Sequence, residues 1–106
     1  MKITRFLGDS KDRIRGFPAG ARNDAGQQIF RVQLGLEPKD WKPLSVVGPG
    51  VREIRIRDER GAYRVVYIST IEDAVYVLHA FQKKTQATPK RDLALAARRL
   101  AELTRR

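Results

Sequence analysis

The sequence predicts an α+β domain in which helices pack on one small antiparallel sheet. Two observations carry this prediction. Apolar residues recur at helical spacing in two segments, 18–36 and 88–103. Between them, residues 44–84 form short β-branched and aromatic runs separated by turn residues. The chain has 106 residues, which predicts one domain covering 1–106.

The N-terminal third predicts a strand and two helices. Residues 3–6 suit a short edge strand, and Asp9 or Ser10 is expected to cap a short helix that Gly16 ends. Pro18 is expected as the first residue of a longer helix, which ends before Pro38. The apolar stripe of that helix consists of Ala21, Ala25, Ile29, Val32 and Leu36.

The middle of the chain predicts the sheet. We assign residues 41–43 to a loop and 45–47 to a short strand. Three longer strands follow at 51–57, 62–68 and 74–81, and the first two are joined by a hairpin loop of about four residues, 58–61. The run 62–68 is continuously apolar except for one arginine, which is typical of a central strand.

A last helix is expected after Thr88, the predicted N-cap, and Pro89, the predicted first helical residue. Its apolar side is formed by Leu93, Ala96, Ala97, Leu100 and Leu103.

The charge of the chain indicates a polyanionic partner, either nucleic acid or an acidic protein. Lys and Arg number 22 against 12 Asp and Glu, a net charge of +10, and +6 of this lies within residues 83–106.

The chain has no Cys and one His, which excludes disulfides, a thiolate nucleophile and a His-rich zinc site. We therefore expect neither a metal nor a cofactor. The chain has no apolar run long enough to cross a bilayer, so we expect a cytoplasmic protein without membrane contact.

Basic residues on neighbouring strands form the best candidate site. Arg55 and Arg57 share one face of a strand, Arg64 lies on the next strand, and Lys83 and Lys84 follow the last one. Because side chains on adjacent antiparallel strands lie within ~5 Å, these cations are expected to converge. Clustered cations near an aromatic ring suit single-stranded RNA. The alternative is an Arg-rich sheet face that is merely solvated.

Single residues of this region also have structural interpretations. His79 is either a hydrogen-bonded core imidazole or a general acid or base. Arg64 either serves the site or forms a structural ion pair, for instance with Glu53. Phe81 is either a core residue or a platform for a base. RNA cleavage by the 2′-OH needs no metal, because Arg can stabilise the pentacoordinate phosphorus and a Lys among cations can accept a proton.

Several segments resemble the phage-derived HigB-like branch of the RelE/ParE toxin superfamily, and together they cover essentially the whole chain. The matching segments are 7–10, 40–44, 50–55, 63–67, 77–85 and 88–100. The stretch from His79 to Thr85 is the most specific of them. The resemblance implies the compact RelE-like, microbial RNase-type fold: N-terminal helices on a small antiparallel sheet, with a C-terminal helix.

The resemblance also implies a function. Toxins of this kind are ribosome-dependent mRNA endoribonucleases that inhibit translation, cut by 2′-OH attack without a metal, and are neutralised by an antitoxin, in this branch usually a helix-turn-helix protein. By position, Arg64 matches the arginine that contacts the scissile phosphate, and Lys83 and Lys84 match the basic positions where catalytic residues cluster. The RNA-binding residues expected are Arg55, Arg57, Phe81, Lys90 and Arg91.

Two points stay open at this level. Some RelE-like toxins use a Tyr near the C-terminus, whereas this chain has no Tyr after Tyr76, so Lys83, Lys84 and His79 compete for the acid and base roles. The ParE branch shares the fold but inhibits DNA gyrase without nuclease chemistry. A ParE-like toxin and an inactive module that binds RNA or an antitoxin are therefore the alternatives. The sequence does not indicate an oligomeric state.

Overall fold

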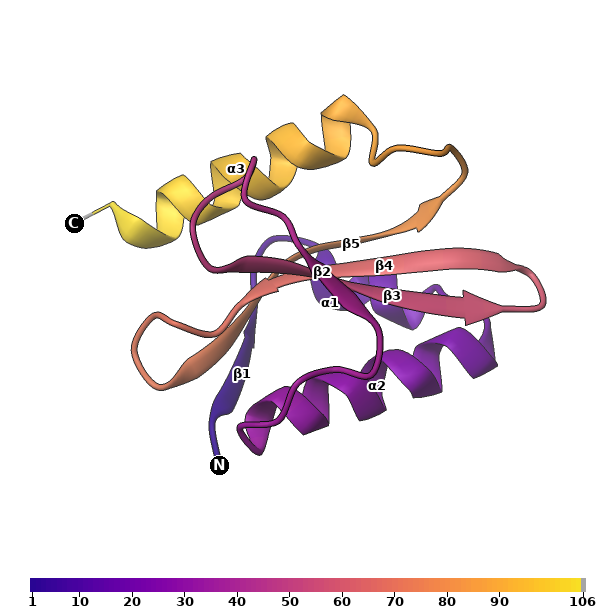
Figure 1. Cartoon of the computed structure of the whole chain (residues 1–106), viewed down its shortest axis with the longest axis horizontal. Helices are drawn as coiled ribbons and strands as arrows, with labels where there is room; N and C mark the ends of the chain where they lie inside the picture. The colour runs from indigo at the N-terminus through magenta and orange to yellow at the C-terminus, as the bar shows by residue number, and fades with distance from the viewer. Residues whose placement is uncertain (106) are drawn as a thin grey trace.

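The computed structural model describes residues 1–105, which form a five-stranded sheet and three helices (Figure 1). The strands are β1 (Ile3–Phe6), β2 (Trp41–Pro43), β3 (Val51–Asp58), β4 (Gly61–Ile68) and β5 (Ala74–Lys83). The helices are α1 (Ser10–Arg15), α2 (Ala19–Gln33) and α3 (Lys90–Thr104). The predicted α+β class and the order of helices and long strands are confirmed.

The strands lie in the order β1-β5-β4-β3-β2. All neighbours are antiparallel except β1 and β5, which run parallel, so the sheet is mixed where a purely antiparallel one was expected. β1 pairs only with residues 74–77 of β5. The rest of β5 therefore has no strand partner on that side among residues 1–105, and α1 packs there instead.

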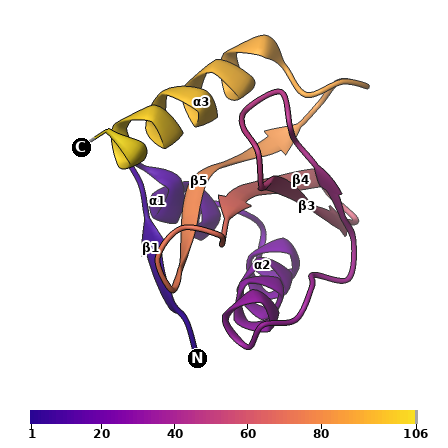
Figure 2. The same cartoon turned by 60° about the vertical axis from the view of Figure 1, so that its left-hand side comes forward.

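Helices cover both faces of the sheet, as Figure 2 shows with α3 on one side and α2 on the other. On the α2 face, a core cluster includes Ile29 of the helix together with Ile54 and Val65 of the strands. On the α3 face, a second cluster includes Ala96 of the helix with Val66 and Leu78. Burial on both faces explains the continuously apolar composition of β4 and β5.

The loop predicted at 41–43 is wrong, because these residues form β2. Trp41 is paired with Ile54 of β3, and the Arg52 guanidinium lies 3.9 Å from the centre of the Trp41 ring. The strand predicted at 45–47 is also wrong. These residues form a turn in which Val46 is 74% exposed. A short β-branched run gains no strand pairing here because the turn before β3 begins immediately after Leu44.

Helix ends differ from the prediction in detail. Pro18 and Pro89 are the N-cap residues and not the first helical residues, so both helices begin one residue later than expected, and no side-chain cap is formed at either helix. Thr88 donates its hydroxyl to Glu53 instead of capping α3. Leu36 lies beyond the end of α2 and is half exposed, so it does not extend the apolar stripe. Within residues 1–105, no helix combines the length and apolar content that crossing a bilayer requires.

Candidate nucleic-acid interface

Five cations gather on the α3 face of the sheet at its β3–β4 hairpin end. Helix α3 packs over the other end of this face, against residues such as Val66 and Ile68, and leaves the hairpin end open. We call this group the hairpin patch; its members are Lys42, Arg55, Arg57, Arg64 and Lys83. Three of them, Arg55, Arg57 and Arg64, line one open pocket of about 290 Å³. The predicted convergence of these three arginines is therefore a feature of the fold.

Strand register explains how the patch forms. Along β3, Arg55 and Arg57 alternate with Ile54 and Ile56, which enter the core on the α2 face. Arg55 is paired directly with Arg64 of β4. Like charges in directly opposed positions destabilise a sheet. Each of these two arginines has a carboxylate of its own, Asp40 at 3.0 Å from Arg55 Nε and Glu53 beside Arg64.

Arg64 lies at the centre of the patch and is only 7% exposed. Its Nη1 donates to the Tyr63 carbonyl at 3.0 Å, and its Nε lies 3.4 Å from Glu53 Oε1. Burial lowers the pKa of Arg64, and Glu53 partly offsets that shift. The structural ion pair considered as the alternative for Arg64 is present, and the same side chain still borders the open pocket.

Glu53 is the anion around which the patch is organised. It is fully buried, lies 3.7 Å from Lys42 Nζ through Oε1, and accepts a 2.9 Å hydrogen bond from Thr88 through Oε2. One buried carboxylate thus holds a guanidinium from β4, an ammonium from β2 and the loop that enters α3. The sequence does not indicate Lys42 as a site residue, because the pattern of residues 41–43 predicts a loop there and not a strand.

Lys83 belongs to the hairpin patch because the charges of other patch cations act on its ammonium group. It pairs in register with Ala62, one of the residues lining the arginine pocket. Burial lowers the pKa of Lys83, and the neighbouring charges of Arg64, Lys42 and Arg55 lower it further, against the opposing effect of Glu53. A lysine whose pKa is lowered in this way is better able to accept a proton.

His79 is a core residue. It is fully buried, its Nε2 lies 2.7 Å from Asp92 Oδ1, and its ring stacks on Phe81 with centroids 5.3 Å apart. Burial is the largest influence on the pKa of His79 and lowers it, against the opposing effect of the Asp92 carboxylate. The imidazole therefore joins β5 to α3, and in this structure it has no surface on which a nucleic acid could touch it.

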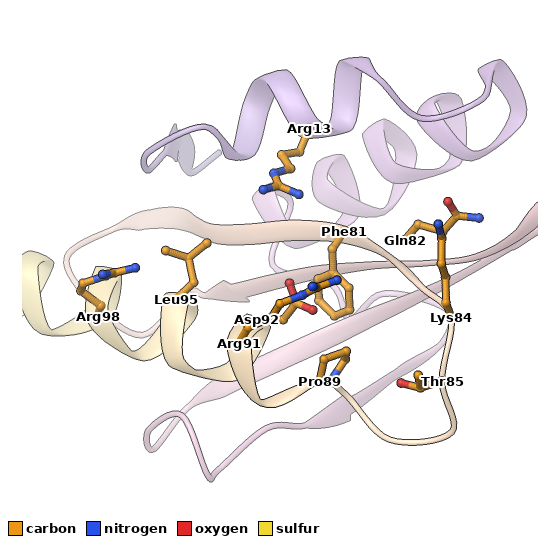
Figure 3. Close-up of a pocket in the computed structure, with 10 residues that line it drawn as sticks. All are labelled: Arg13, Phe81, Gln82, Lys84, Thr85, Pro89, Arg91, Asp92, Leu95 and Arg98. Carbon is orange, nitrogen blue, oxygen red and sulfur yellow. The ribbon is translucent and has the colours of Figure 1, made fainter.

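A second basic surface lies beside the first, in a cleft between α1, the end of β5 and α3 (Figure 3). We call it the edge cleft; its volume is about 650 Å³, and four cations line it: Arg13, Lys84, Arg91 and Arg98. Phe81 and Asp92 also border it. Lys84 and Arg91 thus lie together, apart from the pocket of the three strand arginines, whereas Lys90 is exposed and lines neither surface.

Sequence reasoning did not select Arg13, Arg98 or Asp92. A signal for Arg98 was present, because Arg91, Leu95 and Arg98 follow helical spacing on the side of α3 opposite its core residues. Arg13 carried no such signal, since it reaches the cleft only through the packing of α1 beside β5.

Both surfaces suit phosphate groups. Guanidinium groups bind phosphate oxygens through two parallel hydrogen bonds, and buried surroundings strengthen that attraction. Within residues 1–105, no cluster of three or more His, Asp or Glu side chains is placed to hold a metal ion.

Comparison with protein families identifies the family of this chain. The model of a family described as "Phage derived protein Gp49-like (DUF891)" matches residues 12–101. No curated protein matches the chain.

Proposed function

Since the chain belongs to the phage-derived Gp49-like family, a family of RelE/HigB-type toxins, we propose that it is a type II toxin that cleaves mRNA on the translating ribosome. The observation that carries the nuclease assignment is Arg64, held by Glu53 at the centre of the hairpin patch and bordering an open pocket. An inhibitor that only binds a protein surface has no need of a guanidinium positioned in this way.

Arg64 is the residue to which we assign stabilisation of the transition state. When the 2′-oxygen attacks the neighbouring phosphorus, negative charge builds on the non-bridging oxygens, and a nearby preorganised guanidinium stabilises it. The hydrogen bond to the Tyr63 carbonyl and the ion pair with Glu53 position the guanidinium before RNA arrives, so little reorganisation is needed. Arg55 and Arg57 line the same pocket and bind the flanking phosphates.

Lys83 is the residue to which we assign the role of general base, which accepts the proton of the attacking hydroxyl. In its neutral form it accepts the 2′-OH proton, the new P–O bond forms a 2′,3′-cyclic phosphate, and the 5′-oxygen leaves with a proton from solvent. Burial and the charge of Arg64 lower the pKa of Lys83, which raises the fraction of neutral amine. Of the three candidates for acid or base, Lys83 is favoured because His79 is enclosed and Lys84 lies in the edge cleft.

The toxin assignment also implies a partner. The family implies a cognate antitoxin, and we propose a helix-turn-helix protein whose acidic residues neutralise the hairpin patch. Three of the five patch cations already touch carboxylates of the chain itself, whereas Arg57 and Lys83 have no ion-pair partner within residues 1–105. These two are therefore the expected contacts of an antitoxin carboxylate.

The test is mRNA cleavage in a translation reaction reconstituted with purified ribosomes, with cut sites mapped by primer extension. Arg64→Ala should lower the cleavage rate by about 10²- to 10³-fold, because one transition-state contact is lost. Arg64→Lys should recover only part of the rate, since an ammonium cannot make the bidentate contact. Arg5→Ala is the matched control: it removes one exposed cation from β1, outside the hairpin patch and the edge cleft.

Two results would contradict the proposal. One is mRNA that stays intact while induced cells accumulate DNA breaks, which is the expectation for a gyrase inhibitor. The other is a folded Arg64→Ala protein that cleaves at the wild-type rate.

A further inference from the structure

The edge cleft has an excess of positive charge that the protein itself does not balance. Of the four cations that line it, only Arg13 has an ion-pair partner among residues 1–105, Asp9 at 3.0 Å. The only carboxylate in the lining, Asp92, is held by His79. Asp92 thus supplies one negative charge in the lining against Lys84, Arg91 and Arg98, and this remaining excess of positive charge favours an anionic ligand.

The cleft is assembled from three separate elements. Arg91 and Arg98 come from α3, Lys84 directly follows β5, and Arg13 points from α1 toward them across β5 (Figure 3). Because β1 pairs only with residues 74–77, no strand within residues 1–105 lies beside the last residues of β5. The hollow is thus a consequence of the short first strand.

The cleft adjoins the hairpin patch through β5. Phe81 lines the cleft and is paired in register with Arg64, the central residue of the patch. Lys83 is near enough to Arg64, Lys42 and Arg55 for their charges to lower its pKa, whereas the next residue, Lys84, lines the cleft. The two consecutive lysines therefore connect two basic surfaces into one band across the end of the sheet.

A continuous basic band favours an anion with several linked phosphates over a single small anion. Single-stranded RNA carries one phosphate per nucleotide along a flexible chain, so it can bind Arg64 and continue past Lys83 into the cleft. We propose that the edge cleft binds the backbone phosphates of single-stranded RNA next to the scissile bond, through Lys84, Arg91, Arg98 and Arg13. This inference rests on the proposed function, and it adds a second contact region with residues on α1 and α3.

The probe is a 12-nucleotide, 5′-fluorescein-labelled 2′-O-methyl RNA, which binds but cannot be cleaved because it has no free 2′-OH. Its affinity is measured by fluorescence anisotropy at several salt concentrations. The cleft variant is Arg91→Ala/Arg98→Ala, in which both changed side chains are exposed on α3 and Ala preserves the helix. The control is Arg5→Ala/Arg22→Ala, which removes the same charge from exposed positions outside the cleft.

The cleft variant should bind the RNA at least about tenfold more weakly at 0.1 M salt. The logarithm of the association constant falls as log salt concentration rises, and this negative slope should become shallower by about 1.4, because two phosphate contacts to a single strand are lost. The control should keep the wild-type slope, since distant charges are screened at this ionic strength. Arg91→Gln/Arg98→Gln, which keeps most of the side-chain length, should behave like the alanine pair.

Failure of this inference can be told apart from failure of the proposed function. If Arg64→Ala abolishes cleavage but the cleft variant binds RNA as tightly as the wild type, the nuclease stands and the cleft inference is wrong. An equal loss of affinity in the cleft variant and the control also overturns the inference. If no RNA is cleaved by the wild type but only the cleft variant loses affinity, the cleft is an RNA site on a protein that is not a nuclease.

Discussion

The buried carboxylate of Glu53 lies 3.4 Å from Arg64 Nε, on the neighbouring strand of the sheet. Leaving either charge without the other in this environment is costly, because neither is hydrated as it would be in water. The pair therefore serves two purposes. It offsets the cost of a nearly buried guanidinium in a central strand, and it supplies a counter-charge to a side chain that lines the open pocket with Arg55 and Arg57.

Removing the charge of Glu53 should destabilise the protein. Glu53→Gln leaves Arg64 without its counter-ion, and we expect a loss of about 3 kcal/mol in the free energy of unfolding, measured by urea denaturation. Glu53→Gln/Arg64→Gln should recover more than half of this loss, since no unpaired charge remains. Additive effects of the two single changes would show that the two residues are not coupled.

The pH dependence of cleavage should report Lys83. Only the neutral amine accepts a proton, so the single-turnover rate should rise with pH and level off above the pKa of Lys83, which burial and Arg64 hold below its usual value. Lys83→Arg should remove this rise and lower the rate, because a guanidinium stays protonated throughout the range. An unchanged profile in Lys83→Arg would assign the base to another group.

His79 should make stability depend on pH below neutrality. Burial lowers its pKa in the folded protein, whereas the unfolded chain takes up a proton near pH 6.5. The unfolded state therefore binds more protons below this pH, and the free energy of unfolding should fall as pH decreases from 6.5, by at most about 1.4 kcal/mol per pH unit.

The comparison variant for this effect is His79→Gln, whose side-chain amide can still donate to Asp92. Urea denaturation at pH 7.5 and pH 5.5 should show a smaller difference for His79→Gln than for the wild type. A larger or equal difference in the variant would mean that His79 does not cause the pH dependence.

Asp9 should anchor α3 to the N-terminal segment. Its carboxylate lies 2.7 Å from Arg99 Nη2 and 3.0 Å from Arg13 Nε, and the hydrogen bonds from these two side chains lower the pKa of Asp9 to about 2. Because Asp9 is half exposed, solvent screens the interaction, and Asp9→Asn should cost about 1 kcal/mol at pH 7.

This contribution has a defined pH and salt dependence. It should be present above the ordinary aspartate pKa, 3.8, and be lost as pH falls from 3.8 to about 2. In 1 M NaCl the difference between Asp9→Asn and the wild type should shrink at pH 7. A difference that persists at high salt would indicate a packing effect instead of an ionic one.

Periodicity was a good guide to the long elements of this chain. The stripe Ala21, Ala25, Ile29 and Val32 is buried as predicted, and the apolar runs of β4 and β5 lie between two helical layers. It failed at short segments such as 41–43 and 45–47, where a strand or a turn is decided by which backbone groups find partners across the sheet.

The sequence by itself determined the α+β class, the long strands and helices, and the basic surplus near the C-terminus, because side-chain period and net charge are local properties. Only the tertiary structure decided that Arg55, Arg57 and Arg64 share one pocket while Lys83 and Lys84 diverge. It also decided that Arg13 joins Arg91 and Arg98 in the edge cleft, across about eighty residues of chain. The physical reason is that strand register and helix packing set these distances, and both result from burial of the whole core.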